Sequence, residues 1–230
     1  MVKKVIVISL GGSLIFKDNQ INSSFLRSFK KTIVKNTKNY KFVIVCGGGS
    51  VARMYISGLK EINADEKLQS FAGISVTRTN ARFMSYYFGD ENEDGIAHTT
   101  NEVKKMISKK DIVFCGALEY HPKQTSDSTS AQIAEALNSE FINLTNVAGL
   151  HDKNPLEHKD ARFIPEITWK DFEKMTDKIS FKPGQHFVLD QKAAKLIKEK
   201  KIKTYILGPR TENLDNLLKG KNFKGTIISG

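Results

Sequence analysis

The sequence predicts an α/β protein: a three-layer α/β/α sandwich with a mostly parallel central sheet. Continuous apolar runs at residues 5–10, 42–46 and 112–115 are typical of strands buried on both faces of a sheet. Amphipathic stretches of helical length separate these runs, and the alternation implies parallel strands with right-handed crossovers. The 230 residues contain no linker rich in Gly, Ser or Pro, so residues 1–230 are expected to form a single domain.

In the first half of the chain, hydrophobic periodicity and glycine or asparagine stops mark each expected element. A strand at 5–10 ends at Gly11 and Gly12, and a helix runs from Ser23 to about 36–39. The expected elements that follow are a strand at 42–46, a helix at 51–62, a helix within 68–88, a short helix near 103–107 and a strand at 112–115.

The second half repeats the alternation after a polar loop at 116–124 and an irregular segment at 147–166. Its expected elements are a helix at 131–137, a strand at 141–145, a helix at 192–200, a strand at 203–207, a helix at 214–219 and an edge strand at 226–229.

The composition favours an intracellular protein with anionic ligands. The net charge of +11 suits nucleotides, phosphorylated metabolites or nucleic acid, although a lysine-rich solvated surface explains it equally well. Cys46 and Cys115 lie in apolar runs and are interpreted as reduced core residues, and no cysteine or histidine has metal-ligand spacing. The apolar N-terminal run is too short for a signal peptide, and no segment reaches membrane-spanning length, so a cytoplasmic location is expected.

Two glycine-rich turns suggest phosphate binding. Gly11-Gly12-Ser13 and Gly47-Gly48-Gly49-Ser50 each follow a predicted strand and precede a predicted helix. Such turns let the backbone approach a phosphate and direct helix N-terminal N–H groups at it, although one turn alone could be simple loop chemistry. In a parallel sheet both turns open on the same carboxyl edge, which favours a shared phosphate site.

The pattern argues against two common phosphate motifs. Neither turn carries the Lys-Ser/Thr pair of a Walker loop. Gly47 to Ala52 matches the dinucleotide pattern G-x-G-x-x-A, but the acids Asp65 and Glu66 lie in a polar, helix-like stretch instead of ending a strand. A dehydrogenase is therefore disfavoured.

Three further features surround the turns. Arg53 lies one turn into the helix after the triplet, where its guanidinium could reach a bound phosphate or simply be an exposed charge. The loop at 121–129 is rich in hydroxyls and suits a second anionic ligand, while Ser126 or Asp127 could merely cap the next helix. Asp190 could likewise be the N-cap of the helix that follows it.

Together these residues resemble the amino acid kinase superfamily and, within it, the archaeal-type uridylate (UMP) kinases. The matching blocks are SLGGS at 9–13, CGGGSVARMY at 46–55, GISVTRTNA at 73–81, HPKQTSD at 121–127, TNVAGL at 145–150 and GTII at 225–228. The resemblance covers essentially the whole chain and implies the amino acid kinase fold, with an acceptor (UMP) lobe at about 1–140 and an ATP lobe at about 141–230. It also implies a homo-oligomer, typically a hexamer, without nucleic-acid or membrane partners.

The resemblance implies a role for each matching position. ATP contacts are implied at Gly12, Ser13, Gly49, Arg53, Thr145, His151 and Asn154. UMP contacts are implied at Gly48, Ser70, Tyr120, His121, Pro122, Lys123, Gln124, Thr125 and Ser126. Asp127, Asp190 and Arg53 would be the catalytic residues, the two aspartates organising Mg²⁺ and the nucleotide phosphates. No separate protein-bound metal is implied.

Several positions depart from the family pattern. Ser70 stands where an Asp usually faces the nucleoside, and Ser9 where many superfamily kinases have a Lys. Ala148, His151 and Asn154 replace the usual Asp, Tyr and Asp of the nucleotide turn. These three changes leave open altered base stacking, weaker ATP affinity or another donor nucleotide.

The sequence therefore predicts a kinase that transfers the γ-phosphoryl group of ATP to UMP. Two alternatives stay open: a kinase for another small phosphate such as isopentenyl phosphate, for which Ser70 leaves room, and a catalytically weak nucleotide-binding regulator. A nucleic-acid-binding protein ranks last because no basic stripe with interleaved aromatics is present.

Overall fold

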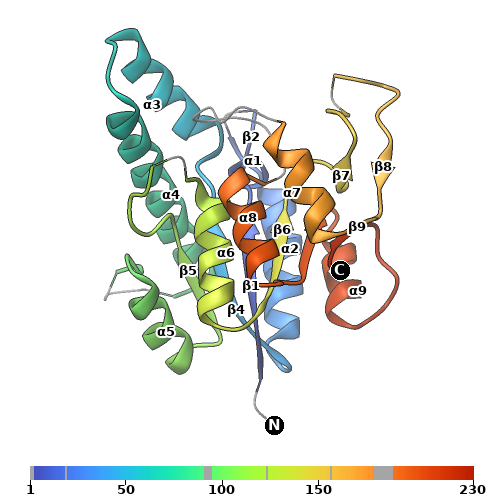
Figure 1. The fold of residues 1–230 in the computed structure, drawn as a ribbon. Coiled ribbons are helices and arrows are strands. Elements are labelled where there is room, and N and C mark those ends of the chain that lie inside the picture. The colour runs from blue at the N-terminus through green and yellow to red at the C-terminus, as the bar shows by residue number, and fades with distance from the viewer. Residues whose placement is uncertain (1–2, 19, 91–94, 123, 156, 179–188) are drawn as a thin grey trace.

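The computed structural model describes residues 3–18, 20–90, 95–122, 124–155, 157–178 and 189–230. In this part of the chain a seven-stranded sheet runs through the centre of the molecule (Figure 1). Its strands, in spatial order, are β5 (Ile112–Cys115), β4 (Tyr40–Cys46), β1 (Lys4–Leu10), β6 (Glu140–Leu144), β10 (Thr204–Leu207), β11 (Gly225–Ile228) and β9 (Glu166–Ile167). All neighbours pair in parallel except β10 with β11, which confirms the mostly parallel sheet.

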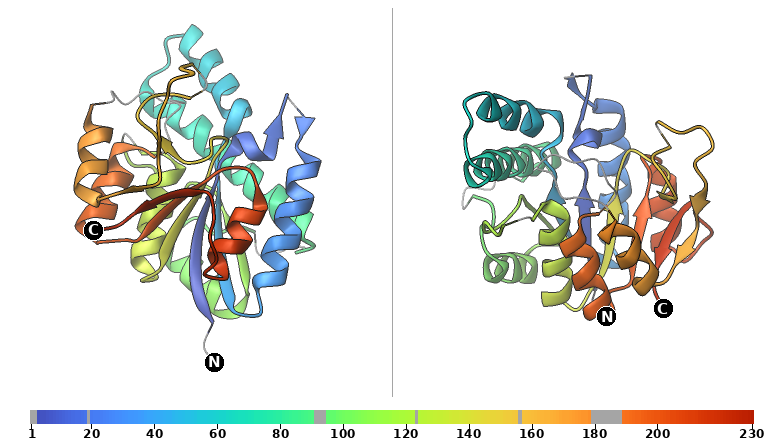
Figure 2. Two further views of the ribbon diagram at one scale, coloured as in Figure 1. Left: turned by 90° about the vertical axis from the view of Figure 1, so that its right-hand side faces the viewer. Right: turned by 45° about the horizontal axis from the view of Figure 1, so that its top comes forward.

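Helices cover both faces of the sheet because its strands are apolar on both faces. In β1, Ile6, Ile8 and Leu10 enter one buried cluster, while Val7 enters the other. The first cluster is covered by α1 (Gly12–Ile15), α2 (Ser23–Asn36), α4 (Glu66–Phe88) and α9 (Thr211–Leu218). The second is covered by α5 (Thr100–Lys109), α6 (Ser126–Ala136), α7 (Trp169–Asp177) and α8 (Gln191–Glu199). Figure 2 shows α7 and α8 on one side and α2 on the other, so the three-layer prediction is confirmed.

The remaining helix, α3 (Gly49–Glu61), packs against α4 at one end of the molecule, beside the carboxyl ends of the parallel strands (Figure 1). The start of α4 follows from its sequence, because the carboxylate of Asp65 accepts a hydrogen bond of 2.8 Å from the backbone N–H of Leu68. Its end follows from Gly89, which adopts a left-handed φ of 88°. The paired helices thus form one wall above the sheet edge.

Some expected boundaries are wrong. The helix expected at 131–137 begins at Ser126, because buried hydroxyls in place of apolar side chains line its first turns. The edge strand expected at 226–229 corresponds to β11, which is not at the edge of the sheet because β9 pairs with its outer side. The irregular segment at 147–166 contains β7 (Leu150–His151) and β8 (Phe163–Ile164), which pair antiparallel.

The sequence also missed four short elements. α1 has only four residues, and the hairpin of β2 (Phe16–Lys17) and β3 (Gln20–Ile21) has only two residues in each strand. In α7 a signal existed, because Trp169, Phe172 and Met175 recur at helical spacing. Within the described ranges, no helix combines the length and apolar character that crossing a membrane requires.

Candidate phosphoryl-transfer site

The carboxyl ends of β1, β4, β5 and β6 meet around one pocket of about 240 Å³. Backbone hydrogen bonds join the strand ends there: Gly47 N–H donates to Leu10 O at 2.8 Å, and Gly11 N–H donates to Leu144 O at 3.0 Å. The two glycine turns therefore lie side by side, as the parallel sheet predicted.

Both turns need glycine because they touch through their backbones. A Cβ atom on Gly12 would lie 2.2 Å from the backbone nitrogen of Gly49, and one on Gly47 would lie 2.8 Å from the nitrogen of Gly12. Gly49 also has a φ of 64°, in the left-handed region that disfavours other residues. Side chains in these turns would force the two strand ends apart.

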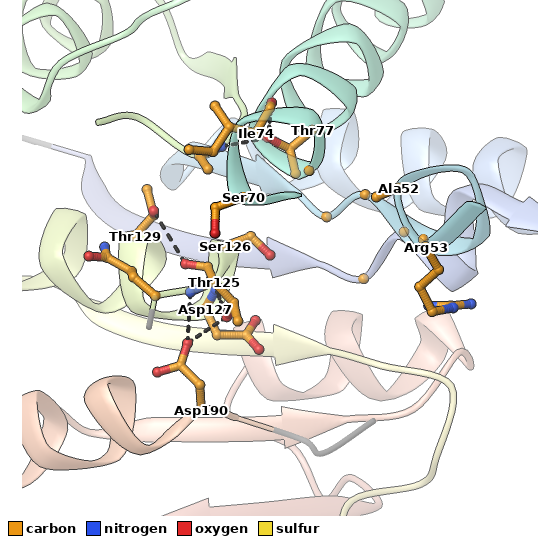
Figure 3. A pocket seen from close by; sticks show the side chains of 18 of the residues that line it. Ala52, Arg53, Ser70, Ile74, Thr77, Thr125, Ser126, Asp127, Thr129 and Asp190 are labelled. Atoms are coloured by element: carbon orange, nitrogen blue, oxygen red, sulfur yellow. Dashed lines mark hydrogen bonds between the residues drawn. The ribbon is translucent and has the colours of Figure 1, made fainter. Parts of the chain in front are cut away.

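One wall of the pocket attracts anions. α3 begins at Gly49 with no side chain capping its N-terminal N–H groups. Uncapped N–H groups carry the positive end of the helix dipole and favour a bound phosphate. Arg53 extends from the first turns of this helix and lines the pocket, on the opposite side from Asp190 (Figure 3).

The opposite wall is organised around Asp190, which is 2% exposed. Its carboxylate accepts hydrogen bonds from the hydroxyls of Thr125 and Ser128, each at 2.5 Å, and from their backbone N–H groups, each at 3.3 Å. It also accepts from Ala193 N–H at 2.8 Å, so the predicted N-cap of α8 is confirmed. One buried carboxylate thus joins the starts of α6 and α8.

Asp127 lies next to Asp190 at the start of α6 (Figure 3). Its Oδ1 accepts a hydrogen bond of 2.8 Å from the Ser9 hydroxyl of β1. Burial, together with the neighbouring carboxylate of Asp190, raises the pKa of Asp127 to about 7, and the Ser9 hydrogen bond opposes the rise. Asp127 is not the N-cap of α6, and neither is Ser126, because the hydroxyl of Thr125 accepts from Asp127 N–H.

Most of the predicted site residues line this pocket. They are Gly12, Ser13, Gly48, Gly49, Arg53, Ser70, Tyr120, His121, Gln124, Thr125, Ser126, Asp127, Thr145 and Asp190. Pro122, His151 and Asn154 are not among the lining residues, and Lys123 lies outside the described residues. The structure therefore brings together the glycine turns, the aspartates and most of the loop after β5.

His151 and Asn154 belong to the segment after β6. The His151 ring lies 3.1 Å from the carbonyl oxygen of Gly149 and packs edge-on against Phe163. The backbone carbonyl of Asn154 accepts from His158 N–H at 2.9 Å. Both residues thus take part in the local folding of this segment.

Sequence reasoning assigned no role to several lining residues. These are Ile56, Gly73, Ile74, Ala117, Glu119, Asn143 and Asn146, among others. A signal existed for Asn143, a polar residue inside the apolar run of β6 that is only 3% exposed. Ile56 and Ile74 looked like ordinary packing residues between two helices, so their pattern gave no signal.

Among the described residues, no group of three or more histidine, cysteine or acidic side chains is arranged to hold a metal ion. The two cysteines are free and buried, as predicted. Burial raises the pKa of Cys115 to about 12, so this thiol is poorly reactive.

Comparisons with known proteins agree with this geometry. The model of the amino acid kinase family matches residues 4–208. The chain is 33% identical over 229 residues to a uridylate kinase of Methanoregula boonei, covering 98% of this chain and 96% of that protein. It is 31% identical to a uridylate kinase of Thermococcus kodakarensis, with 97% and 98% covered. The crystal structure of uridylate kinase from Archaeoglobus fulgidus superposes with a TM-score of 0.80 at 30% identity, covering 97% of this chain and 99% of that one.

Proposed function

The chain belongs to the amino acid kinase family, and from this premise we propose that it transfers the γ-phosphoryl group of ATP to UMP, forming UDP for pyrimidine nucleotide synthesis. One observation carries the proposal: two touching glycine turns, an uncapped helix start and a pair of aspartates line the same pocket. The uridylate kinases that match over nearly the whole chain support UMP as the acceptor.

Phosphoryl transfer needs positioning and neutralisation of charge more than covalent chemistry. In this proposal ATP phosphates lie against Gly12, Ser13 and Gly49, where backbone N–H groups and the α3 dipole favour negative charge. Arg53 adds a guanidinium beside them, and Thr145 lies at the end of β6 on the same edge. His151 and Asn154 are retained as contacts for the rest of the donor nucleotide.

UMP is assigned to the other half of the pocket, bordered by Gly48, Ser70 and the loop from Tyr120 to Ser126. The Ser70 hydroxyl donates to the backbone carbonyl of Glu66 at 2.7 Å, which leaves its lone pairs to accept from the nucleoside. In this assignment residues 1–140 form the acceptor lobe and 141–230 the ATP lobe.

The residues present also fit Mg²⁺ accompanying ATP. This ion takes one or two carboxylates together with substrate phosphates, and needs no cage of protein ligands. Asp127 presents a carboxylate at the pocket, so this residue would hold the ion, which when bound would neutralise phosphate charge. Asp190 has its oxygens engaged by hydroxyls and N–H groups, so we assign it to holding α6 and Asp127 in place.

A coupled assay of ADP release tests the proposed function. Purified protein with Mg-ATP and a panel of UMP, CMP, AMP and isopentenyl phosphate should release ADP with UMP far faster than with the others. Faster turnover of isopentenyl phosphate would move the protein to another branch of the family. ATP binding without turnover of any acceptor would replace the kinase by a nucleotide-binding regulator.

Arg53→Ala is expected to raise KM for ATP and to lower kcat/KM by roughly 10- to 100-fold, because a charge-assisted contact to phosphate contributes about 1.5–3 kcal/mol. Initial rates at varied ATP would measure the effect. Arg27→Ala on α2 removes an exposed arginine that does not line the pocket, so this matched control should leave both constants unchanged. Rates for Arg53→Ala equal to those of the control would remove Arg53 from the site.

We also propose a homo-oligomer, a hexamer by family resemblance, in the cytoplasm. α3 and α4, with the turn between them, expose large apolar side chains: Met54 62%, Tyr55 55%, Ile62 73%, Leu68 52% and Phe71 42%. Exposed apolar surface of this kind is typical of protein interfaces. Two free, buried cysteines suit a reducing compartment.

Light scattering after size exclusion would test the assembly. Tyr55→Glu is expected to reduce the molar mass, because a charge at an apolar contact is costly to bury. Val34→Glu on α2, where Val34 is 48% exposed, is the matched control and should keep the wild-type mass. A monomeric wild-type protein would contradict the proposal.

A further inference from the structure

Helix α4 carries polar side chains that the proposed ligand contacts leave unexplained. Thr77, Arg78 and Asn80 lie within one turn of this helix. Thr77 and Asn80 are 6% and 3% exposed, and Arg78 is half-buried. Arg78 and Asn80 do not line the pocket, so neither is placed to contact a substrate. Buried polar groups are costly unless they are hydrogen-bonded, so their partners indicate their role.

Thr77 and Arg78 hold the loop that follows β5. The hydroxyl of Thr77 accepts from Ala117 N–H at 2.9 Å and donates to Ile74 O at 2.7 Å. The guanidinium of Arg78 donates to two successive carbonyl oxygens, from Nε to Ala117 at 3.1 Å and from Nη2 to Leu118. A planar guanidinium can hold two neighbouring acceptors at once, which the single ammonium of Lys does less well.

The same loop lies directly on the backbone of α4. A Cβ atom on Gly116 would lie 2.5 Å from the backbone nitrogen of Arg78 and 2.7 Å from Oγ1 of Thr77. Further along, the ring of Tyr120 packs against Phe71 of α4 with centroids 5.2 Å apart. The beginning and the end of the loop from 116 to 120 are thus both fixed to one helix.

Asn80 fixes the second glycine turn to that helix. Its Nδ2 donates to the carbonyl oxygen of Gly47 at 2.8 Å, with a longer contact of 3.5 Å to that of Gly48. The turn and the loop approach α4 from the ends of neighbouring strands, β4 and β5. Thr77, Arg78 and Asn80, which make these hydrogen bonds, lie within four consecutive residues of α4. The helix therefore sets the distance between the turn and the loop.

We propose that Thr77, Arg78 and Asn80 are positioning residues that hold the loop from 116 to 120 in register with the Gly47–Gly49 turn, and so align the acceptor with the donor. The proposal rests on the proposed function, which assigns to UMP the continuation of this loop from Tyr120 to Ser126. Arg78 and Thr77 act on the acceptor loop alone, whereas Asn80 acts on the turn shared by both substrates. A displacement of about 1 Å in such a site can cost up to about 100-fold in rate.

Arg78→Met keeps an unbranched apolar stem and removes every donor. We expect it to raise KM for UMP at least about tenfold, with KM for ATP within about twofold of wild type, because only the acceptor loop is released. Arg78→Lys should fall between Arg78→Met and wild type. Arg82→Met, which removes an exposed arginine one turn later on the same helix, is the matched control and should resemble wild type.

Hydrogen–deuterium exchange provides a readout that does not depend on the substrate. In Arg78→Met the amides of residues 117–120 should exchange faster, while those of β1 and β4 keep their protection. An unchanged KM for UMP together with unchanged exchange in the loop would overturn the proposal. A rise in both KM values with faster exchange across the sheet would also overturn it, because that result indicates general destabilisation.

Asn80→Ala distinguishes an effect on the glycine turn from an effect on the loop, because Asn80 bonds only the turn. It also provides a test if the Arg78 variants do not fold. It should raise KM for both ATP and UMP and accelerate exchange at residues 47–49 more than at 117–120. Faster exchange at residues 117–120 than at 47–49 would contradict the assignment of Asn80 to the glycine turn. If wild-type protein turned over no acceptor, the proposed function would fail, yet the exchange data would still decide whether α4 holds the two loops.

Discussion

Gly12→Ala is expected to lower kcat/KM for UMP phosphorylation at least about 100-fold, because it separates the two glycine turns that form the donor site. The added Cβ would lie 2.2 Å from Gly49 N and 2.7 Å from Gly48 C, both backbone atoms that no rotamer change can move away. Overpacking of this kind also costs about 1–3 kcal/mol of folding free energy. Steady-state kinetics and urea denaturation would measure the two effects.

Gly58→Ala provides the matched control for that substitution. Gly58 lies in α3, and a Cβ there would meet no atom within 4 Å. The variant should retain activity and gain about 0.5–1 kcal/mol, because Ala is the better helix former. Wild-type kinetics in Gly12→Ala would mean that the turns can separate without loss of activity. The assignment of the donor site to both turns would then be wrong.

The part of the site that the sequence predicted is the part encoded by local pattern. Apolar runs ending in glycine place β1 and β4 and their turns, since a parallel sheet brings successive strand ends to one edge. The N-cap role of Asp190 could be predicted for the same reason, because the carboxylate bonds an N–H only three residues away.

The remainder depends on contacts between distant segments. Asp190 bonds Ser128 across 62 positions of the chain, and Asn80 bonds Gly47 across 33. Neither pairing has a local signature, so the polar residue can be recognised in the sequence but its partner cannot be predicted. The start of α6 was missed for the same reason, because hydroxyls satisfied by Asp190 and by the helix backbone take the place of apolar residues there.

Asp127→Asn is the second substitution with a large expected effect. It removes the carboxylate proposed to hold Mg²⁺ beside the phosphates, so kcat should fall at least about 100-fold, as for loss of one electrostatic contact in a transition state. In wild type, kcat/KM should also decline as pH falls below about 7, the pKa of Asp127, because the protonated form no longer carries the charge.

Ser9→Ala tests the origin of that pH dependence. The hydroxyl of Ser9 donates to Asp127 and lowers the pKa of the carboxyl, so its removal should move the acidic limb of the kcat/KM profile to higher pH. The measurement is the full pH–rate profile of both proteins. An acidic limb at the same pH in both would mean that another group controls it.

The same pKa makes Asp127 a cost to folding at alkaline pH. Its pKa rises from 3.8 to about 7 in the folded protein, so the folded state retains a proton that the unfolded chain releases. Stability is therefore greatest below about pH 4 as far as this group is concerned, and declines as pH rises toward 7. Above that pH the inactive Asp127→Asn should be more stable than wild type, by about 1–2 kcal/mol once the open pocket beside the carboxylate is allowed for.

Asp215→Asn should change the free energy of unfolding at neutral pH in the opposite direction, and so serves as the control. Hydrogen bonds from Lys219 and Asn36 lower the pKa of Asp215 to about 2, so its contribution to stability is present above pH 4 and disappears only as pH falls toward 2. At neutral pH Asp215→Asn should destabilise the protein while leaving kcat unchanged. Urea denaturation of wild type and both variants at about pH 4 and about pH 8 would measure the difference, and equal pH dependence in wild type and Asp127→Asn would contradict it. The opposite signs follow from the surroundings of each carboxylate, because Asp127 is buried beside Asp190 whereas Asp215 accepts hydrogen bonds from Lys219 and Asn36. The first carboxylate is kept at the pocket for chemistry at the expense of stability, and the second is paired for stability alone.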